Sequence, residues 1–356
     1  MYDDSPHIVI WEMTRACALA CQHCRAKAIP RRNDAELTTA EAFNLVDQVA
    51  GFGHPIFILT GGDPFMRPDV FEIVEYAAKR ELRIAVSPSG TGRLTKATLE
   101  RLAAAGCRRM SLSIDGWDVA SHDAFRGVKG TFERTLGAAR QAREAGIELQ
   151  INTTIARHNK SHIKEIAALV EQIDAQVWTA FFLIPTGRAK LEDCLDAAGF
   201  EAAFADLFDV WLTAPFTVKT TEAPHFRRYV MQHLAKLEPD KRPRSAEHLH
   251  FPAIGDGKGF VFISHTGEIC PSGFLPVIAG NVREESLLDV YRNDPMFQRL
   301  RDPDRTKGKC GLCDYRTLCG GSRARAYGFD GDPFGAEPCC VYESPAYLAS
   351  LESVLT

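Results

Sequence analysis

A repeat of roughly thirty residues constrains the fold of this chain more than any other feature: a short apolar run, a polar turn and then an amphipathic helix. Apolar runs lie at residues 8–13, 56–60, 83–87, 110–114, 148–154 and 177–184, and helical periodicity lies between them at about 39–52, 68–80, 95–105, 131–145 and 161–173. Strands that alternate with helices must run parallel. The pattern predicts an α/β fold, an open (β/α)6 partial barrel of the TIM type, with its site at the carboxyl ends of the strands.

The sequence after residue 190 has a different pattern. An amphipathic helix is predicted at 200–211, and the Pro, Lys and Arg residues of 238–245 predict an exposed loop. A hairpin with a His-Thr-Gly turn is predicted at 259–271, and a helix from Ser286. We therefore expect the barrel at 1–190, a helical bridge over part of the barrel mouth at 191–250, and a small α+β domain at 251–356.

Cysteine usage and charge narrow the class of protein. The 11 Cys form two groups near the ends of the chain, with Cys107 and Cys194 alone between them. This distribution favours metal clusters in a reducing cytoplasm over a disulfide framework. The sequence has no apolar run of eighteen residues and no basic, apolar leader, which predicts neither membrane insertion nor secretion. A net charge of −4 argues against a general nucleic-acid binder.

Three cysteines follow the first predicted strand in the spacing C-x3-C-x2-C: Cys17, Cys21 and Cys24. Three thiolates can hold only three irons of a 4Fe-4S cube, so the fourth iron stays open. The alternative interpretations of the triplet are a zinc knuckle or buried thiols. The spacing resembles that of the radical S-adenosylmethionine (SAM) enzymes over residues 8–190. The resemblance implies that the open iron binds SAM and that an electron from the cube cleaves it to a 5'-deoxyadenosyl radical.

The ends of the next strands carry further candidates. Thr60-Gly61-Gly62-Asp63-Pro64 is similar to the family's Gly-Gly-Glu-Pro, with Asp in place of Glu, and the resemblance implies that its backbone receives the methionyl amino group. Small hydroxyls and carboxylates at strand ends can hydrogen-bond a ribose, which makes Ser113 and Asp115 candidates. Asp115 could equally cap an Asp-Gly turn.

Three more SAM contacts are expected from position in the family pattern. Arg126 either meets the methionyl carboxylate or pairs with Asp123. Asn152 on the fifth strand and Ile184 after the sixth lie where the family holds ribose and adenine.

A second cysteine group, C-x2-C-x5-C with a distant fourth Cys, can hold another cube or zinc. It resembles the SPASM (twitch-like) extension of radical SAM enzymes, which implies one auxiliary 4Fe-4S cluster on Cys310, Cys313, Cys319 and either Cys339 or Cys340. We favour Cys340 because Val-Tyr follows it, as in the most similar subgroup.

Departures from that extension limit the cluster count to one auxiliary cube. Cys270 and Gly280 match its first part, but Ser264, Glu285 and Arg323 stand where three Cys are expected. We interpret Cys270 as a vestige packed in the hairpin. Cys107 is predicted to be a core residue, and Cys194 has no evident partner in the sequence.

The substrate is constrained less well than the mechanism. His23-Cys24-Arg25-Ala26 and the stretch 319–326 resemble the radical SAM enzymes of haem biosynthesis, which implies an oxidoreductase or lyase-type enzyme acting on tetrapyrrole propionates. Candidate substrate contacts are Arg188, Arg323, Arg325, Phe181 and Phe182. A maturase of a ribosomally made peptide is the alternative, although a first strand within about eight residues of Met1 argues against a leader-binding domain before it.

A non-catalytic iron-sulfur electron carrier is the alternative of another class. Reduced flavodoxin or ferredoxin is the expected electron donor.

Overall fold

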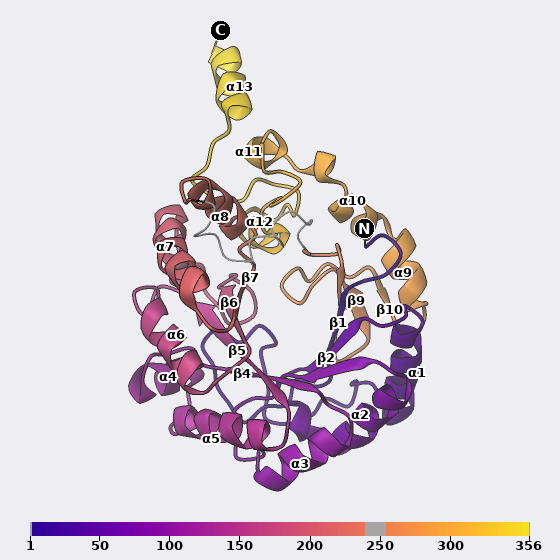
Figure 1. Ribbon diagram of the computed structural model, residues 1–356. Helices are drawn as coiled ribbons and strands as arrows, with labels where there is room; N and C mark the ends of the chain where they lie inside the picture. Colours follow the sequence, from indigo (N-terminus) through magenta and orange to yellow (C-terminus); the bar gives the residue numbers. More distant parts are fainter. Residues whose placement is uncertain (1, 239–253, 356) are drawn as a thin grey trace.

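The strands of the computed structural model, which describes residues 2–238 and 254–355, form one curved sheet (Figure 1). Its order is β10-β9-β8-β1-β2-β3-β4-β5-β6-β7. The neighbours from β8 through β1 to β7 are all parallel, and β9 and β10 are antiparallel additions at one edge. The predicted partial barrel is confirmed, and its sheet is wider than six strands.

The six predicted strands are present and pair in sequence order. Their bounds are β1 (Ile8–Glu12), β2 (Ile56–Thr60), β3 (Arg83–Val86), β4 (Arg109–Ser113), β5 (Glu148–Ile155) and β6 (Val177–Phe182). Side chains alternate between the two faces of each strand. Val9 and Trp11 of β1 are fully buried against the helices, whereas Ile8 and Ile10 face the barrel interior.

Helices cover the outer face of this sheet (Figure 1). They are α1 (Thr39–Ala50), α2 (Val70–Lys79), α3 (Lys96–Ala104), α4 (Val119–Arg126), α5 (Thr131–Glu144) and α6 (Ile163–Gln172). The predicted helices are confirmed with ends shifted by one or two residues, and α4 is an addition. Helix α1 begins at a capping box between Thr38 and Glu41, and its buried Leu45, Val46 and Val49 belong to the main hydrophobic core.

The segment expected as a helical bridge also extends the sheet. Helix α7 (Ala197–Thr213) contains the predicted amphipathic helix and is followed by β7 (Thr217–Thr221) and α8 (Phe226–Leu234). Strand β7, which the sequence analysis did not predict, pairs in parallel with β6. The predicted loop at 238–245 lies outside the described residues from 239 onward.

The C-terminal hairpin is confirmed as β8 (Phe260–Ile263) and β9 (Glu268–Cys270), but β8 also pairs in parallel with β1. The first strand of the chain is therefore held between β2 and a strand from the last third. The remaining strand and α-helices of the described residues are β10 (Gly280–Asn281), α9 (Leu287–Asn293), α10 (Pro295–Arg301), α11 (Gly308–Gly311), α12 (Arg323–Asp330) and α13 (Pro345–Leu355). Among the described residues, no helix is both long enough and apolar enough to cross a membrane.

Candidate active site

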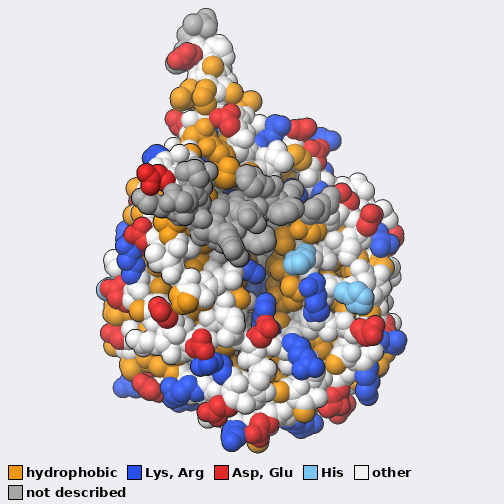
Figure 2. Space-filling model, viewed as in Figure 1, with side chains coloured by type: hydrophobic (Ala, Val, Ile, Leu, Met, Phe, Trp, Pro, Cys, Tyr) orange, Lys and Arg blue, Asp and Glu red, His pale blue; other side chains and the backbone are white. Residues whose placement is uncertain are grey.

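A cavity of about 1670 Å³ occupies the interior of the partial barrel. It is lined by strand residues, by the cysteine-bearing loop after β1, and by C-terminal residues such as Phe274 and Ser322. Figure 2 shows hydrophobic side chains and Lys or Arg side chains meeting at a hollow near the centre of the molecule. Ligand pockets commonly measure about 300–1000 Å³, so this cavity has room for more than one ligand.

The loop that carries Cys17, Cys21 and Cys24 is clamped by three neighbouring segments. The amides of Gly62 and Asp63 donate to the carbonyls of Thr14 (2.7 Å) and Ala16 (2.8 Å), just before Cys17. The Ala20 amide donates to the Arg126 carbonyl at the end of α4, and the Arg188 amide donates to the Cys24 carbonyl at 3.0 Å. The backbone of three separate segments, after β2, at the end of α4 and after β6, therefore fixes the cysteine spacing.

Glycines permit two of these close approaches. A Cβ on Gly62 would lie 2.4 Å from the Ala16 carbonyl oxygen, and one on Gly187 would lie 2.4 Å from the Cys24 carbonyl oxygen. Gly187 also has φ +66, a conformation that favours glycine. The Gly-Gly motif thus serves the cysteine loop directly, in addition to any approach to a ligand.

Each of the three thiols borders the cavity and has a hydrogen-bond partner. The sulfur of Cys17 lies 3.3 Å from the Ser89 hydroxyl and 3.3 Å from the Leu19 amide. The sulfur of Cys24 accepts from the Ala28 amide at 3.4 Å, and that of Cys21 lies 3.6 Å from Arg126 Nη1. Donors around sulfur stabilise the anionic thiolate, so the surroundings fit a site for a thiolate-bound cluster.

The predicted SAM contacts divide into two sets. Gly61, Gly62, Ser113, Asn152, Ile184 and Arg126 all line the cavity. The side chain of Asp63 instead points into the protein, where it accepts from the Thr91 hydroxyl at 2.9 Å and the Phe65 amide at 3.2 Å.

Asp115 likewise faces the protein interior and orients Arg126. Its carboxylate lies 2.7 Å from Arg126 Nε and accepts from the Thr154 amide at 2.6 Å. Burial alone would raise the pKa of Asp115, but the Arg126 charge, the nearby His23 and His122 and the Thr154 amide together outweigh burial and lower it. The proposed Arg126–Asp123 pair is wrong: Asp123 accepts from the Thr131 hydroxyl and from the Phe132 amide.

Three polar side chains on the cavity wall carry buried nitrogens without a hydrogen-bond partner among the described residues. They are the Nδ1 of His23, the Nε and Nη2 of Arg188 and the Nη2 of Arg323. Burial lowers the pKa of His23 to about 4, so its ring is neutral at neutral pH. Buried polar groups without protein partners suit a polar ligand, and the Arg188 guanidinium suits an anionic one.

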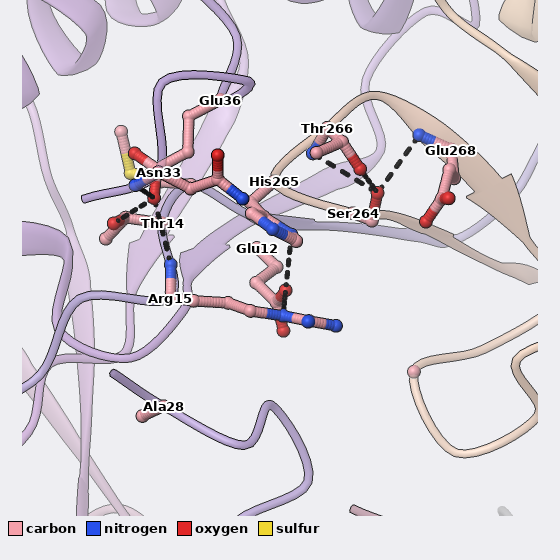
Figure 3. A network of polar contacts seen from close by, with 12 residues as sticks. Glu12, Thr14, Arg15, Ala28, Asn33, Glu36, Ser264, His265, Thr266 and Glu268 are labelled. Carbon is pink, nitrogen blue, oxygen red and sulfur yellow. Dashed lines mark hydrogen bonds and ion pairs between the residues drawn. The ribbon is translucent and has the colours of Figure 1, made fainter. Parts of the chain in front are cut away.

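A buried charge network joins the cysteine loop to the C-terminal hairpin. Glu12, fully buried at the end of β1, lies 2.5 Å from Arg25 Nη2. It also lies 3.1 Å from His265 Nδ1 and 3.4 Å from Arg15 Nε (Figure 3). Burial would raise the Glu12 pKa, but Arg25 and the other two partners lower it to about 2. Sequence reasoning missed this link because its partners are far apart in the chain.

The second cysteine group surrounds a smaller cavity. Cys310, Cys313, Cys319 and Cys340 line it together with His225 and the cations Arg228, Lys309 and Arg316. Cys339 does not line it; its buried thiol donates to the Leu195 carbonyl at 3.4 Å. The geometry therefore favours Cys340 over Cys339 as the fourth thiol.

Several expected substrate contacts have protein partners instead. Arg325 is fully buried, pairs with Glu337 at 3.1 Å and lines neither cavity. Arg323 lines the large cavity but donates to the Pro333 and Gly335 carbonyls. Phe182 stacks on Phe200 at 4.7 Å.

Arg188 and Phe181 are the candidates that border the large cavity with fewer protein contacts. Phe181 lies 6.4 Å from Phe274, ring centroid to ring centroid.

The cysteines outside the two groups are packed in the protein interior. The residues that stand where the extension has Cys make hydrogen bonds of their own. Cys107 belongs to the main core, as predicted, and Cys270 is buried at the end of β9. Cys194 is buried beside Leu183 in a small apolar cluster. The Ser264 hydroxyl accepts from the Thr266 and Glu268 amides in the hairpin turn (Figure 3). The Glu285 carboxylate accepts from the Asn281 amide.

Glu222 is an unpredicted carboxyl on the cavity wall, directly after β7. Its φ of +57 is unusual for a residue with a Cβ, and it accepts from the Ser322 hydroxyl at 2.5 Å. Burial and the neighbouring Asp256 raise the pKa of Glu222 to about 8. The carboxyl is therefore protonated at neutral pH.

The raised pKa of Glu222 predicts a pH-dependent stability. The folded chain keeps this proton between the ordinary pKa of 4.5 and about 8, whereas the unfolded chain loses it. The contribution of Glu222 to stability is therefore complete below pH 4.5 and is lost as the pH rises to about 8. Glu222→Gln removes this loss, so the melting temperature of the variant relative to the wild type should rise between pH 5 and pH 8.5. A difference that is constant with pH would show that the Glu222 pKa is ordinary.

Known proteins resemble this chain over most of its length. Residues 11–170 match the family model of the Radical SAM superfamily. An AdoMet-dependent heme synthase of Nitratidesulfovibrio vulgaris is 43% identical over 96% of this chain and 94% of its own, and one of Methanosarcina barkeri is 40% identical over 95% and 97%. The solved structure of Streptococcus suis SuiB bound to precursor peptide SuiA has a TM-score of 0.74 at 19% identity, covering 95% of this chain and 76% of that one.

These matches agree with the cysteine triplet at the cavity and with the partial barrel that carries it. They favour radical chemistry over the non-catalytic electron carrier. The chain belongs to the radical SAM superfamily and is a radical SAM enzyme that uses a 4Fe-4S cluster and SAM.

Proposed function

We propose that this enzyme is an oxidoreductase that modifies the propionate side chains of a haem-type tetrapyrrole. The main observation behind this proposal is the 43% identity to an AdoMet-dependent heme synthase across 96% of the chain. The cavity supports the proposal because it combines apolar walls with the unpaired guanidinium nitrogens of Arg188. A flat apolar ring with carboxylates needs both features.

The residues of this chain divide the work of binding the cofactor. Cys17, Cys21 and Cys24 would hold the cluster, and Gly61 and Gly62 offer backbone groups beside it. When bound, the cluster and SAM supply the radical that removes a hydrogen atom from the substrate.

Side chains on the neighbouring strand ends would hold the rest of SAM. Ser113 and Asn152 offer polar groups for a ribose, and Ile184 offers an apolar surface for adenine. Arg126 would bind the methionyl carboxylate, with Asp115 fixing its guanidinium. Asp63 and Asp115, whose carboxylates bond to other groups of the protein, act as positioning residues and not as SAM contacts. We keep reduced flavodoxin or ferredoxin as the proposed electron donor.

An auxiliary 4Fe-4S cluster on Cys310, Cys313, Cys319 and Cys340 would complete the enzyme. Four thiolates are the usual ligand set of such a cube, and the cations that line the same cavity would offset its negative charge. The cluster would accept the electron that the substrate radical loses.

The ligand sets predict two clusters per chain. Anaerobically reconstituted enzyme should contain about eight irons and eight sulfides per chain, and Cys340→Ala should lower both toward about four. Cys339→Ala is the matched control and should leave them at about eight. About four irons together with one tightly bound zinc in the wild type would contradict the auxiliary cube.

The substrate proposal predicts binding of an iron porphyrin that carries propionates. Titration should shift its Soret band with saturation, and Arg188→Ala should weaken binding about 10- to 100-fold, because a charge-assisted hydrogen bond contributes about 1.5–3 kcal/mol. Arg140→Ala, which changes an exposed arginine of α5, should bind as the wild type does. Absence of saturable binding at tens of micromolar would favour the alternative, a peptide maturase.

A further inference from the structure

The buried side chain of His225 has aromatic neighbours but, among the described residues, no hydrogen-bond partner. His225 precedes α8 directly, its side chain is among the most buried in the chain at 1% exposure, and its ring packs against Phe200 and Phe204 at 4.8 Å between centroids. Both ring nitrogens, Nδ1 and Nε2, are buried without a hydrogen bond among the described residues. An imidazole carries at least one N–H in either protonation state, and leaving it unpaired in the interior is costly.

Of the two cavities, His225 borders the smaller one. It lines the cavity surrounded by Cys310, Cys313, Cys319 and Cys340. The cations on the same wall have other partners.

Arg228 pairs with Glu201, Lys309 donates to the Cys340 carbonyl, and Arg316 donates to the Gly311 carbonyl at 2.8 Å. His225 differs from these three because neither ring nitrogen has a hydrogen-bond partner within the part of the chain that the structure describes.

We propose that His225 donates an N–H hydrogen bond to a sulfur of the auxiliary cluster and thereby raises the cluster's reduction potential. The inference rests on the proposed auxiliary cluster. Reduction adds negative charge to the sulfurs, so a donor fixed beside them stabilises the reduced form more than the oxidised form. His225 is therefore a residue that tunes the cluster and makes it a better electron acceptor.

The aromatic packing around His225 explains how the donor is held in place. Phe204 contacts His225 edge-on, and Phe204 also packs against Phe226 of α8 at 5.3 Å. A ring enclosed on its sides cannot rotate away to water. The N–H is thus fixed in a dry environment, where a hydrogen bond has a stronger electrostatic effect than in water.

The test compares donors and non-donors at position 225 in the reconstituted holoenzyme. His225→Phe keeps an aromatic ring without a donor, and His225→Gln restores an N–H. His233→Phe is the matched control. His233 lies on α8, the helix that follows His225, but its ring stacks on Tyr229, its Nδ1–H donates to the Tyr229 carbonyl at 2.8 Å, and it lines neither cavity. The readouts are iron content and the midpoint potential of the auxiliary cluster from an EPR-monitored redox titration, with SAM added to mark the other cluster's signal.

We expect a more negative auxiliary potential in His225→Phe and a potential near the wild-type value in His225→Gln and His233→Phe. Loss of about four irons in His225→Phe but not in His225→Gln would also support the hydrogen bond, since the donor is then needed to retain the cluster. Equal potentials in His225→Phe and the wild type, with both clusters present, would overturn the inference and leave the auxiliary cluster standing. The same holds if His225→Gln behaves as His225→Phe does. A wild-type enzyme without a second cluster would overturn the auxiliary cluster and the inference together.

Discussion

Changing Cys17, Cys21 and Cys24 together to Ala is expected to abolish reductive cleavage of SAM. The three thiols are the only cysteines of the chain on the loop after β1, and each borders the large cavity. Without them no cluster can present an open iron to SAM. Formation of 5'-deoxyadenosine under anaerobic reducing conditions should fall to the level of a sample without protein.

The same variant should retain the second cluster. Cys310, Cys313, Cys319 and Cys340 line a separate cavity, so about four irons per chain and their visible absorbance should remain. Cys270→Ala is a matched control, because Cys270 is buried in the hairpin and should leave both iron content and SAM cleavage unchanged. Persisting 5'-deoxyadenosine formation in the triple variant would mean that the reactive cluster lies elsewhere.

The repeat of apolar runs and helices was enough to predict most of the barrel. Each predicted strand has one face buried against helices and one toward the cavity, which gives a clear apolar signal. Strand β7 was missed because its sequence, Thr-Val-Lys-Thr-Thr, contains one buried residue, Val218, among polar ones. It is the last strand at its edge of the sheet, where apolar patterning is weak.

The joining of the C-terminal hairpin to the barrel could not be read from the sequence. The pairing of β8 with β1 joins Phe260 to Ile8 across about two hundred and fifty residues. The sequence of a strand does not specify which distant strand it pairs with. The hairpin itself was predictable because its turn and both strands are local.

The candidate site was predictable where its chemistry depends on local spacing. The cysteine triplet is a local pattern, and the loop has the backbone support that such a pattern needs. Side-chain direction was not predictable at the strand ends, where the chain leaves the alternation of the sheet. Asp63 and Asp115 therefore point into the protein, and Arg325 pairs with buried Glu337, which no local sequence pattern marks as its partner.

Gly62→Ala is expected to disable the reactive cluster although Gly62 has no side chain to lose. The added Cβ would lie 2.4 Å from the Ala16 carbonyl oxygen and 2.7 Å from the Arg15 carbonyl oxygen. Both are backbone atoms, so the clash is relieved only by moving the segment that leads into Cys17. The amide bonds from Gly62 to Thr14 and from Asp63 to Ala16 hold the two segments together and oppose a small adjustment.

We therefore expect Gly62→Ala to lower the rate of SAM cleavage about 100-fold or more, since displacements near 1 Å in a catalytic arrangement have effects of that size. Iron content should fall from about eight toward about four, because the auxiliary group does not contact Gly62. Gly137→Ala is the matched control: nothing lies within 4 Å of the added Cβ in α5, so it should keep full activity and gain about 0.5–1 kcal/mol of stability. A Gly62→Ala enzyme with eight irons and a normal rate would show that the loop adapts without cost, and the Gly-Gly motif would then be required only by the ligand.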